Sequence, residues 1–385
     1  MQDKIINYKV TLETAGPVHI GSGTDINKKD CLYMTNEKRV YIMDSMKVFE
    51  GIKKNNLLGS YEQFLLDPEQ KNFAVFVRNH GIKPDEYKGW ASYTLFLNDI
   101  LAVTDNSRSN GGGIDTISAF IKDVYGCPYI PGSSLKGALR TAFENTFCQK
   151  DMQKYQGIVR NIETEKFEKR ARYLSASNRS LSAGIFNLLE RDEKIKSSAV
   201  NDIFSFIRVS DSEPLNVSDL VLCQKVDVYT DGNTKNLPLK RECLKPGTRI
   251  TFNIEIDKSY MDIKGGEQID LSGSLLYEVI DMSYKNYCDS FLSAFKKVSS
   301  VSSLAGHLIY IGGGSGFATK TSVYPLFDNR VRAASAVENI MANTTPPVHK
   351  HSQDVRKYNV SPHMRKCTRY KGELYDMGLC KIEIN

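Results

Sequence analysis

The sequence predicts an α+β fold, and three patterns carry that prediction. Residues 7–13 alternate apolar and polar side chains, as a half-buried strand does, and residues 249–256 repeat the alternation with four apolar side chains on one face. Between these segments, apolar residues from Leu135 to Phe143 recur at helical spacing. A second helix is expected at 277–295. This order of strands and helices is compatible with a ferredoxin-like or RRM-type sheet interrupted by insertions.

The first strand leads into the string HIGSG at residues 19–23, which we expect to be a loop. Its glycines allow a tight turn, and His19 and Ser22 are potential donors to phosphate or ribose. The alternative for His19 is a packed, hydrogen-bonded side chain. Gly21 and Gly23 lack the third glycine of a dinucleotide-binding fingerprint, so a Rossmann fold is excluded.

Several further elements are expected between residues 30 and 124. They are a strand pair at 30–34 and 40–43, helices at 46–53 and 61–66, a glycine-rich linker at 107–113, and a helix marked by Ile114, Ile117, Ile121 and Val124.

The string YIPGSSLKGALR at residues 129–140 organises the chain. It predicts an extended run, a Pro-Gly turn and a helix that begins on a serine cap. Lys136 and Arg140 are four residues apart on the polar face, where an anion would relieve their repulsion and the free N–H groups of a helix N-terminus would attract it. Gly132 and Gly137 would let a ligand backbone come close. The stretch therefore predicts a phosphate-binding platform.

This stretch is also compatible with three alternatives. A P-loop needs its lysine directly after the second glycine, whereas Lys136 precedes Gly137, which argues against nucleoside triphosphate binding. Ser133 and Lys136 match the S-x-x-K pattern of acyl-transferring enzymes, but the chain offers only SDS at 210–212 and KTS at 320–322 in place of the companion motifs. The third alternative is a capped core helix whose cations face water.

The string IGGGSGF at residues 311–317 follows an expected strand and precedes Thr319 and Lys320. Such a cluster can cradle a nucleic-acid backbone while a base stacks on Phe317; a flexible hairpin turn is the alternative. The tail from 349 to 371 carries seven lysines and arginines against Asp354, with tyrosines interleaved. Basic residues with aromatics suit single-stranded RNA.

Composition allows a polyanionic partner without requiring one. Lysine plus arginine number 51 and aspartate plus glutamate 45, for a net charge of +6. The chain begins without an apolar leader and has no apolar run long enough for a bilayer, so we expect a cytoplasmic protein that does not bind membranes. Eight cysteines without a C-x-x-C pair suit reduced thiols.

We predict no metal, no cofactor and no catalytic centre. Possible zinc ligands stand near the C-terminus, but their spacings match no standard site; they are His349, His351, His363, Cys367 and Cys380. No paired carboxylates stand out.

Taken together, the three strings resemble the RAMP superfamily of CRISPR-associated proteins. IPGSSLKGALR at 130–140 is similar to the family signature, PVHIGSG at 17–23 to its first loop, and IGGGSGF at 311–317 to its glycine-rich loop, in the expected order. The resemblance implies a Cas7-like, modified ferredoxin-like core with helical insertions and a β-rich C-terminal half.

Within that superfamily, the chain looks most like the fifth subunit of type III-A Csm effector complexes. The resemblance implies a non-catalytic subunit that holds the 3′ region of crRNA at the end of the backbone filament. Such a subunit contacts the backbone and small subunits and is needed for crRNA maturation and antiviral defence, with host ribonucleases as candidate partners for 3′ trimming. The alternative is a RAMP endoribonuclease or a target-cleaving backbone subunit. Asp25 and Asp30 follow the first glycine motif, but neither matches the family context, so no catalytic role is assigned.

The expected divisions are an N-terminal part of the core at 1–144, a charged helical insert at 145–203 and a β-rich half at 204–385. The predicted RNA-binding residues are His19, Gly21, Ser22, Ser133, Ser134, Lys136, Arg140, Gly313, Gly314, Phe317, Lys320, Arg365 and Arg369.

Overall fold

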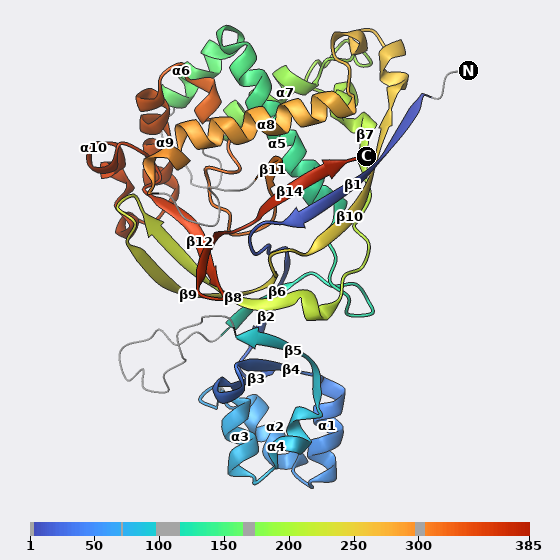
Figure 1. Ribbon diagram of the computed structural model, residues 1–385, viewed down its shortest axis with the longest axis vertical. Coiled ribbons are helices and arrows are strands. Elements are labelled where there is room, and N and C mark those ends of the chain that lie inside the picture. The colour runs from blue at the N-terminus through green and yellow to red at the C-terminus, as the bar shows by residue number, and fades with distance from the viewer. Residues whose placement is uncertain (1–3, 71, 98–115, 165–173, 297–304) are drawn as a thin grey trace.

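The structure is a computed structural model that describes residues 4–70, 72–97, 116–164, 174–296 and 305–385. Two sheets form its framework, and the longest helices cover one face of the first sheet (Figure 1). A smaller helical unit lies at the far end of the second sheet.

The first sheet contains five strands in the order β11-β14-β1-β10-β7, and every neighbouring pair is antiparallel. The strands are β1 (Ile5–Thr14), β7 (Ile207–Val209), β10 (Arg249–Asp257), β11 (His307–Tyr310) and β14 (Leu379–Ile384). Helix α5 (Gly132–Lys150) precedes β7, and helix α8 (Gly273–Ser290) follows β10.

The strand order confirms the ferredoxin-like prediction. Along the chain the elements run β1, α5, β7, β10, α8 and β14, and the last strand lies beside the first. This is the βαββαβ arrangement, with β11 added as an outer strand. The strands predicted at 7–13 and 249–256 are β1 and β10, and the helix predicted at 277–295 is α8 with shifted ends.

The core lies between this sheet and the two helices. Val10 of β1 is paired with Phe252 of β10, and Leu12 with Ile250, so their side chains share one face. All four are buried together with Leu135 of α5. Each such side chain contributes about 1.5–3 kcal/mol on leaving water, which explains why the period-2 pattern decides the register.

The second sheet has the order β2-β6-β9-β8-β5-β4-β3, with β12 paired to β8 and β13 paired to β12. Its strands are β2 (Gly21–Asn27), β3 (Cys31–Met34), β4 (Arg39–Met43), β5 (Ala91–Leu97), β6 (Thr116–Phe120), β8 (Leu220–Tyr229), β9 (Thr234–Leu244), β12 (Met364–Tyr370) and β13 (Glu373–Asp376). The strand pair predicted at 30–34 and 40–43 is β3 with β4 and is confirmed.

Four short helices connect β4 to β5 and form a unit with its own core. They are α1 (Ser45–Lys54), α2 (Leu58–Leu66), α3 (Phe73–Asn79) and α4 (Pro84–Lys88). Asp44 caps α1 by accepting hydrogen bonds from two backbone N–H groups, and Phe64, Phe76 and Trp90 fill the centre.

The remaining helices are α6 (Gln156–Thr164), α7 (Ser175–Phe186), α9 (Arg330–Thr344) and α10 (Asp354–Tyr358). None of the helices in the described ranges combines the length and apolarity needed to cross a bilayer.

Three local predictions are wrong. The segment predicted as a helix near Ile117 is strand β6, because pairing with β2 and β9 outweighs its helical spacing. The expected loop at 19–23 becomes strand β2 from Gly21, with a register shift that absorbs the glycines. Helix α5 begins at Gly132 without a serine cap. The linker at 107–113 lies outside the described residues, and the division at 144 and 203 stays a prediction.

Candidate nucleic-acid interface

The three sequence strings meet at one cavity of about 380 Å³. The end of the β1–β2 connection, the first turns of α5 and the glycine-rich segment after β11 each supply part of its wall. The lining residues are Ile20, Gly21, Ser133, Ser134, Gly137, Ala138, Thr141, Tyr310, Ile311, Gly312, Gly313, Thr319 and Lys320. Segments almost 300 residues apart in sequence therefore form a single concave surface.

The glycine-rich segment is bonded directly to the first string. The Gly313 N–H donates to the His19 carbonyl oxygen at 2.6 Å. A Cβ at Gly312 would lie 2.3 Å from that same oxygen, and Gly312 has a φ of +74°. Only glycine allows both this close contact with the His19 carbonyl oxygen and a positive φ. Gly312, the first glycine of the string, is therefore required for the contact between the glycine-rich segment and His19.

His19 is a packed residue at this junction. Its side chain is 5% exposed, its Nδ1–H donates to the Glu242 carbonyl oxygen at 2.7 Å, and its ring meets Phe120 edge-on. Burial lowers the pKa of His19, which favours the neutral imidazole. The geometry therefore fits the packed alternative, in which His19 positions the cavity wall.

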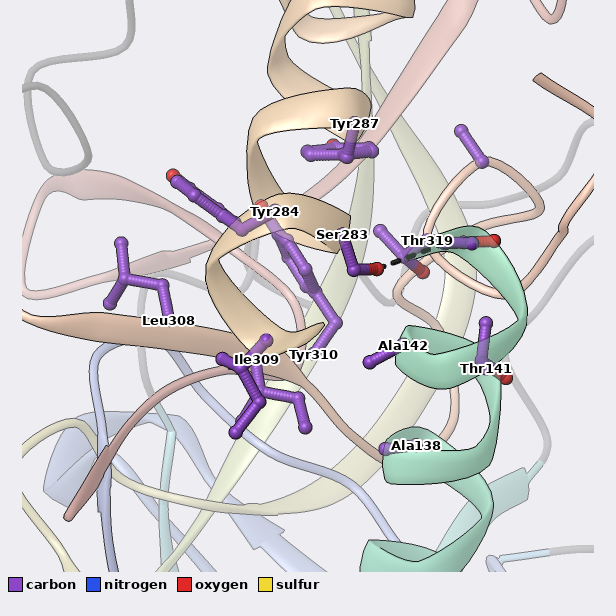
Figure 2. A pocket seen from close by; sticks show the side chains of 13 residues that line it. Ala138, Thr141, Ala142, Ser283, Tyr284, Tyr287, Leu308, Ile309, Tyr310 and Thr319 are labelled. Atoms are coloured by element: carbon purple, nitrogen blue, oxygen red, sulfur yellow. Dashed lines mark hydrogen bonds between the residues drawn. The ribbon is translucent and has the colours of Figure 1, made fainter. Parts of the chain in front are cut away.

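A much smaller cavity of about 30 Å³ adjoins the first and extends between α5 and α8. Figure 2 shows Ala138, Thr141 and Ala142 of α5 on one side and Tyr284 and Tyr287 of α8 on the other. The two cavities share the residues Ala138, Thr141, Tyr310 and Thr319. The larger cavity is thus backed by the interface between α5 and α8.

The cations of the α5 string are held by the protein itself. Lys136 Nζ donates to the Ile207 carbonyl oxygen at 2.6 Å, and burial lowers the pKa of Lys136. Arg140 forms an ion pair with Asp202 at 2.9 Å, and its guanidinium lies 3.8 Å from the centre of the Phe186 ring. These contacts orient both head groups toward neighbouring protein segments.

The helix N-terminus is likewise engaged. The Gly132 N–H donates to the Asp211 carboxylate at 2.8 Å, so an internal carboxylate occupies the place predicted for a phosphate. Lys136 Nζ is not bonded to Ser133, which removes the support for an acyl-transferring pair. The string in this chain joins α5 to the β7 segment, and it faces the cavity through the exposed Ser133, the half-buried Ser134, Gly137 and Ala138.

Gly132→Ala is expected to lower the free energy of unfolding by about 1–3 kcal/mol. A Cβ there would lie 2.3 Å from the Val209 carbonyl oxygen and 2.4 Å from that of Ser210, and backbone cannot move aside cheaply. Gly137→Ala is the matched control, because its Cβ meets no atom within 4 Å and alanine favours the helix by up to about 1 kcal/mol. Urea denaturation of both variants checks this. Equal stability of Gly132→Ala and the wild type would contradict it.

Four cations from β8, β9, β12 and the glycine-rich segment form a basic cluster beside the cavity. They are Lys225, Arg241, Lys320 and Lys366. Partial desolvation and the neighbouring Arg241 lower the pKa of Lys320, although its side chain still reaches solvent. Burial and Lys366 lower the pKa of Lys225. The Asp227 carboxylate lies beside them, with Oδ1 2.8 Å from Lys366 Nζ and 4.0 Å from Lys225 Nζ. The repulsion within the cluster favours a bound polyanion.

Arg241 is the strongest candidate in this cluster. It lies beside Gly314, where a Cβ would be 2.8 Å from Nη1. That Nη1 is buried without a hydrogen-bond partner among the described residues. Lys320 is exposed and has no ion pair in the described part of the chain. Sequence reasoning missed Arg241 and Lys225, because single cations on strands carry no local signal of convergence.

The other predicted residues differ in accessibility. Ser22 is exposed and close to Thr24, and Phe317 is half-buried against the main core. Arg369 is half-buried and donates to Thr234. Arg365 is 3% exposed and forms an ion pair with Asp376, so its guanidinium does not face solvent. The basic tail is thus divided, with Lys366 in the basic cluster and Arg365 in the interior.

Comparison with known protein families matches the part of the chain that contains the three strings. A family model described as the RAMP superfamily matches residues 11–317, a range that contains all three strings. The chain belongs to the RAMP superfamily. This confirms the resemblance drawn from the motifs.

Within the RAMP superfamily, the chain is similar to proteins named CRISPR system Cms protein Csm5. The protein from Mycobacterium tuberculosis is 29% identical over 395 residues, which cover 98% of this chain and 97% of the relative. The protein from Streptococcus thermophilus is 30% identical, covering 83% of this chain and 81% of the relative. The resemblance to the fifth Csm subunit is confirmed at this level.

Solved structures share the fold. A chain from the cryo-EM structure of a Csm–crRNA–target RNA ternary complex in a type III-A CRISPR-Cas system has a TM-score of 0.68 at 20% identity, covering 98% of this chain and 100% of that one. The crystal structure of T. onnurineus Csm5 has a TM-score of 0.60 at 21% identity, covering 96% and 99%.

Proposed function

We propose that this RAMP protein is the Csm5-type subunit of a type III-A Csm complex and binds crRNA without cleaving it. The observation that carries the proposal is the meeting of the three motif strings at one cavity, beside the basic cluster. Similarity to Csm5 proteins over most of the chain supports the choice of subunit. The 3′ region of crRNA, at the end of the backbone filament, is the proposed ligand, and the neighbouring backbone and small subunits are the proposed partners.

The proposed contacts neutralise phosphates and do not read sequence. Lys320 and Arg241 are available for charge-assisted bonds to a phosphate, and the backbone at Gly313 and Gly314 lets the ribose-phosphate chain approach closely. The exposed hydroxyl of Ser133 and the Ser134 side chain add donors on the opposite wall. This division of roles predicts affinity that falls steeply with salt for every RNA sequence.

The same geometry favours binding over catalysis. A metal-independent endonuclease, as the alternative function, would use His19 together with Lys136, but His19 is buried and hydrogen-bonded to the Glu242 carbonyl oxygen. Its proposed partner Lys136 donates to Ile207, and no hydrogen bond joins the two side chains in the described chain. We therefore place crRNA maturation outside this subunit, with host ribonucleases as the proposed trimming enzymes.

A salt titration with labelled single-stranded RNA in EDTA tests the proposal. Arg241→Gln with Lys320→Gln should weaken binding of all sequences and reduce the salt slope by about 0.7 for each lost phosphate contact. Lys53→Gln with Lys54→Gln, at the end of α1, makes the same charge change away from the cavity and should leave the slope unchanged. An unchanged slope in the first variant would contradict the proposed contacts.

Two further arms separate the alternatives. Lys136→Ala with Arg140→Ala should reduce thermal stability and leave the salt slope intact, because both head groups serve protein contacts. A reduced slope would instead support their predicted role in phosphate binding.

Discrete cleavage of the RNA in EDTA, abolished by His19→Ala, would favour the endoribonuclease alternative.

A further inference from the structure

Two histidines and an aspartate come together at a place that the RNA proposal does not use. His351 lies in a single 3₁₀ turn (His351–Gln353), Asp354 begins α10, and His363 immediately precedes β12. Their side chains are 5%, 0% and 9% exposed, respectively. Sequence reasoning included both histidines among possible zinc ligands but missed Asp354, because only folding brings the spacing H-x₂-D-x₈-H together.

The three side chains are arranged around one carboxylate. His351 Nδ1 is 2.8 Å from Asp354 Oδ2, and His363 Nδ1 is 2.6 Å from Oδ1. The hydroxyl of Ser361 donates to Oδ2 at 2.8 Å. One donor atom from each of the three residues lies within 4.8 Å of the others. Each carboxylate oxygen therefore has an imidazole nitrogen of its own.

The surroundings hold the rings in place. The ring of Tyr358 stacks on His363 with centroids 4.9 Å apart, and Tyr229 of β8 stacks on it at 5.9 Å. The His351 and His363 centroids are 5.1 Å apart. Donor side chains locked by packing bind a metal without a large ordering cost.

The cluster also needs a positive charge. Asp354 is fully buried, and within the described ranges its ion-pair partners are the two histidines, with no lysine or arginine among them. An isolated buried carboxylate is costly unless a cation neutralises it. A divalent metal ion or a protonated imidazole can supply that charge, and the two leave different experimental signatures.

We propose that His351, Asp354 and His363 form a binding site for Zn²⁺. Two imidazole nitrogens and one carboxylate oxygen are a donor set that zinc accepts, with a water molecule in the remaining position. On binding, the metal would be held by the Nδ1 lone pairs, with each neutral imidazole carrying its proton on Nε2 instead, and Ser361 would support the ligand oxygen. The ion would tie the 351–358 segment to the start of β12, the strand that carries Lys366.

The test uses the full chain. Chelator-stripped protein is titrated with Zn²⁺ against a chromophoric competitor, and metal content is measured by elemental analysis. We expect one equivalent per chain and a higher melting temperature with zinc. His363→Gln and Asp354→Asn should each weaken binding at least about tenfold. His307→Gln is the matched control, because His307 forms an exposed pair with Asp281 and should leave binding unchanged.

Two measurements keep the result interpretable. The Co²⁺ spectrum of the wild type should lack thiolate charge-transfer absorption, which separates this site from the eight free cysteines. Circular dichroism of each variant identifies a loss of fold. Substoichiometric zinc in the wild type, a thiolate band, or unchanged affinity in a folded His363→Gln protein would each overturn the proposal and assign the positive charge to a protonated imidazole.

Discussion

Arg365→Met is expected to destabilise the protein by about 3–5 kcal/mol, the largest effect of any single substitution considered for the tail. Arg365 Nε and Nη2 each lie 2.5 Å from an oxygen of Asp376, and the two side chains are 3% and 2% exposed. Tyr310 also donates to Asp376, at 2.8 Å. Removing the guanidinium leaves a buried carboxylate without its cation, which is far more costly than losing an exposed pair.

The double variant Arg365→Met with Asp376→Leu separates charge burial from packing. It should recover most of the lost stability, because a well-packed apolar pair can replace a buried ion pair with little cost. Lys357→Met removes an exposed cation from the same tail and should change stability by less than about 0.5 kcal/mol. Urea denaturation of the three proteins gives the comparison. If Arg365→Met behaves like Lys357→Met, the ion pair is not the stabilising contact described here.

Lys240→Met is expected to stabilise the protein near neutral pH by up to about 3 kcal/mol. Lys240 is 2% exposed, and its Nζ has no hydrogen-bond partner among the described residues. Nζ lies 4.2 Å from the centre of the Tyr33 ring, a contact that returns part of the cost of burial. Burial lowers the pKa of Lys240 from 10.5 to about 8.

The pH dependence gives this prediction its sign. Because the folded-state pKa lies below the unfolded value, the unfolded chain binds more protons between about pH 8 and 10.5. The stability of the wild type should therefore gain from this residue as pH rises through that window. The advantage of Lys240→Met should be full below about pH 8 and should shrink toward about pH 10. Lys235→Met, exposed on the same strand, is the control and should show no such trend. A constant difference between the variants across pH would rule out a titrating buried amine.

Local periodicity was sufficient for the elements that build the core. The alternation in β1 and β10 and the helical stripe of α5 follow directly from which side chains must leave water. The three motif strings also lie together at one cavity, as their resemblance to one family implied. The prediction of helix or strand is wrong where pairing with neighbouring strands outweighs the helical spacing of apolar residues, as at β6.

Charge was harder to interpret from sequence than hydrophobicity. A count of basic residues in the 349–371 tail treats Arg365 and Lys366 alike. Neighbouring positions on a strand point to opposite faces, however, and Arg365 is buried. Lys136 and Arg140 looked free because their partners, Ile207 and Asp202, are some 60–70 residues away in sequence. Long-range partners of this kind are decided by tertiary contacts, which no local pattern encodes.

The position of β14 has a consequence for how the protein is made. This strand contains residues 379–384 and lies between β11 and β1 in the first sheet. Because β1 ends at residue 14 and β14 begins at residue 379, β1 is synthesised more than 360 residues before this neighbour. The sheet therefore cannot close until this late strand is made, so we expect a nascent chain that stops short of β14 to expose the unpaired edge of β1.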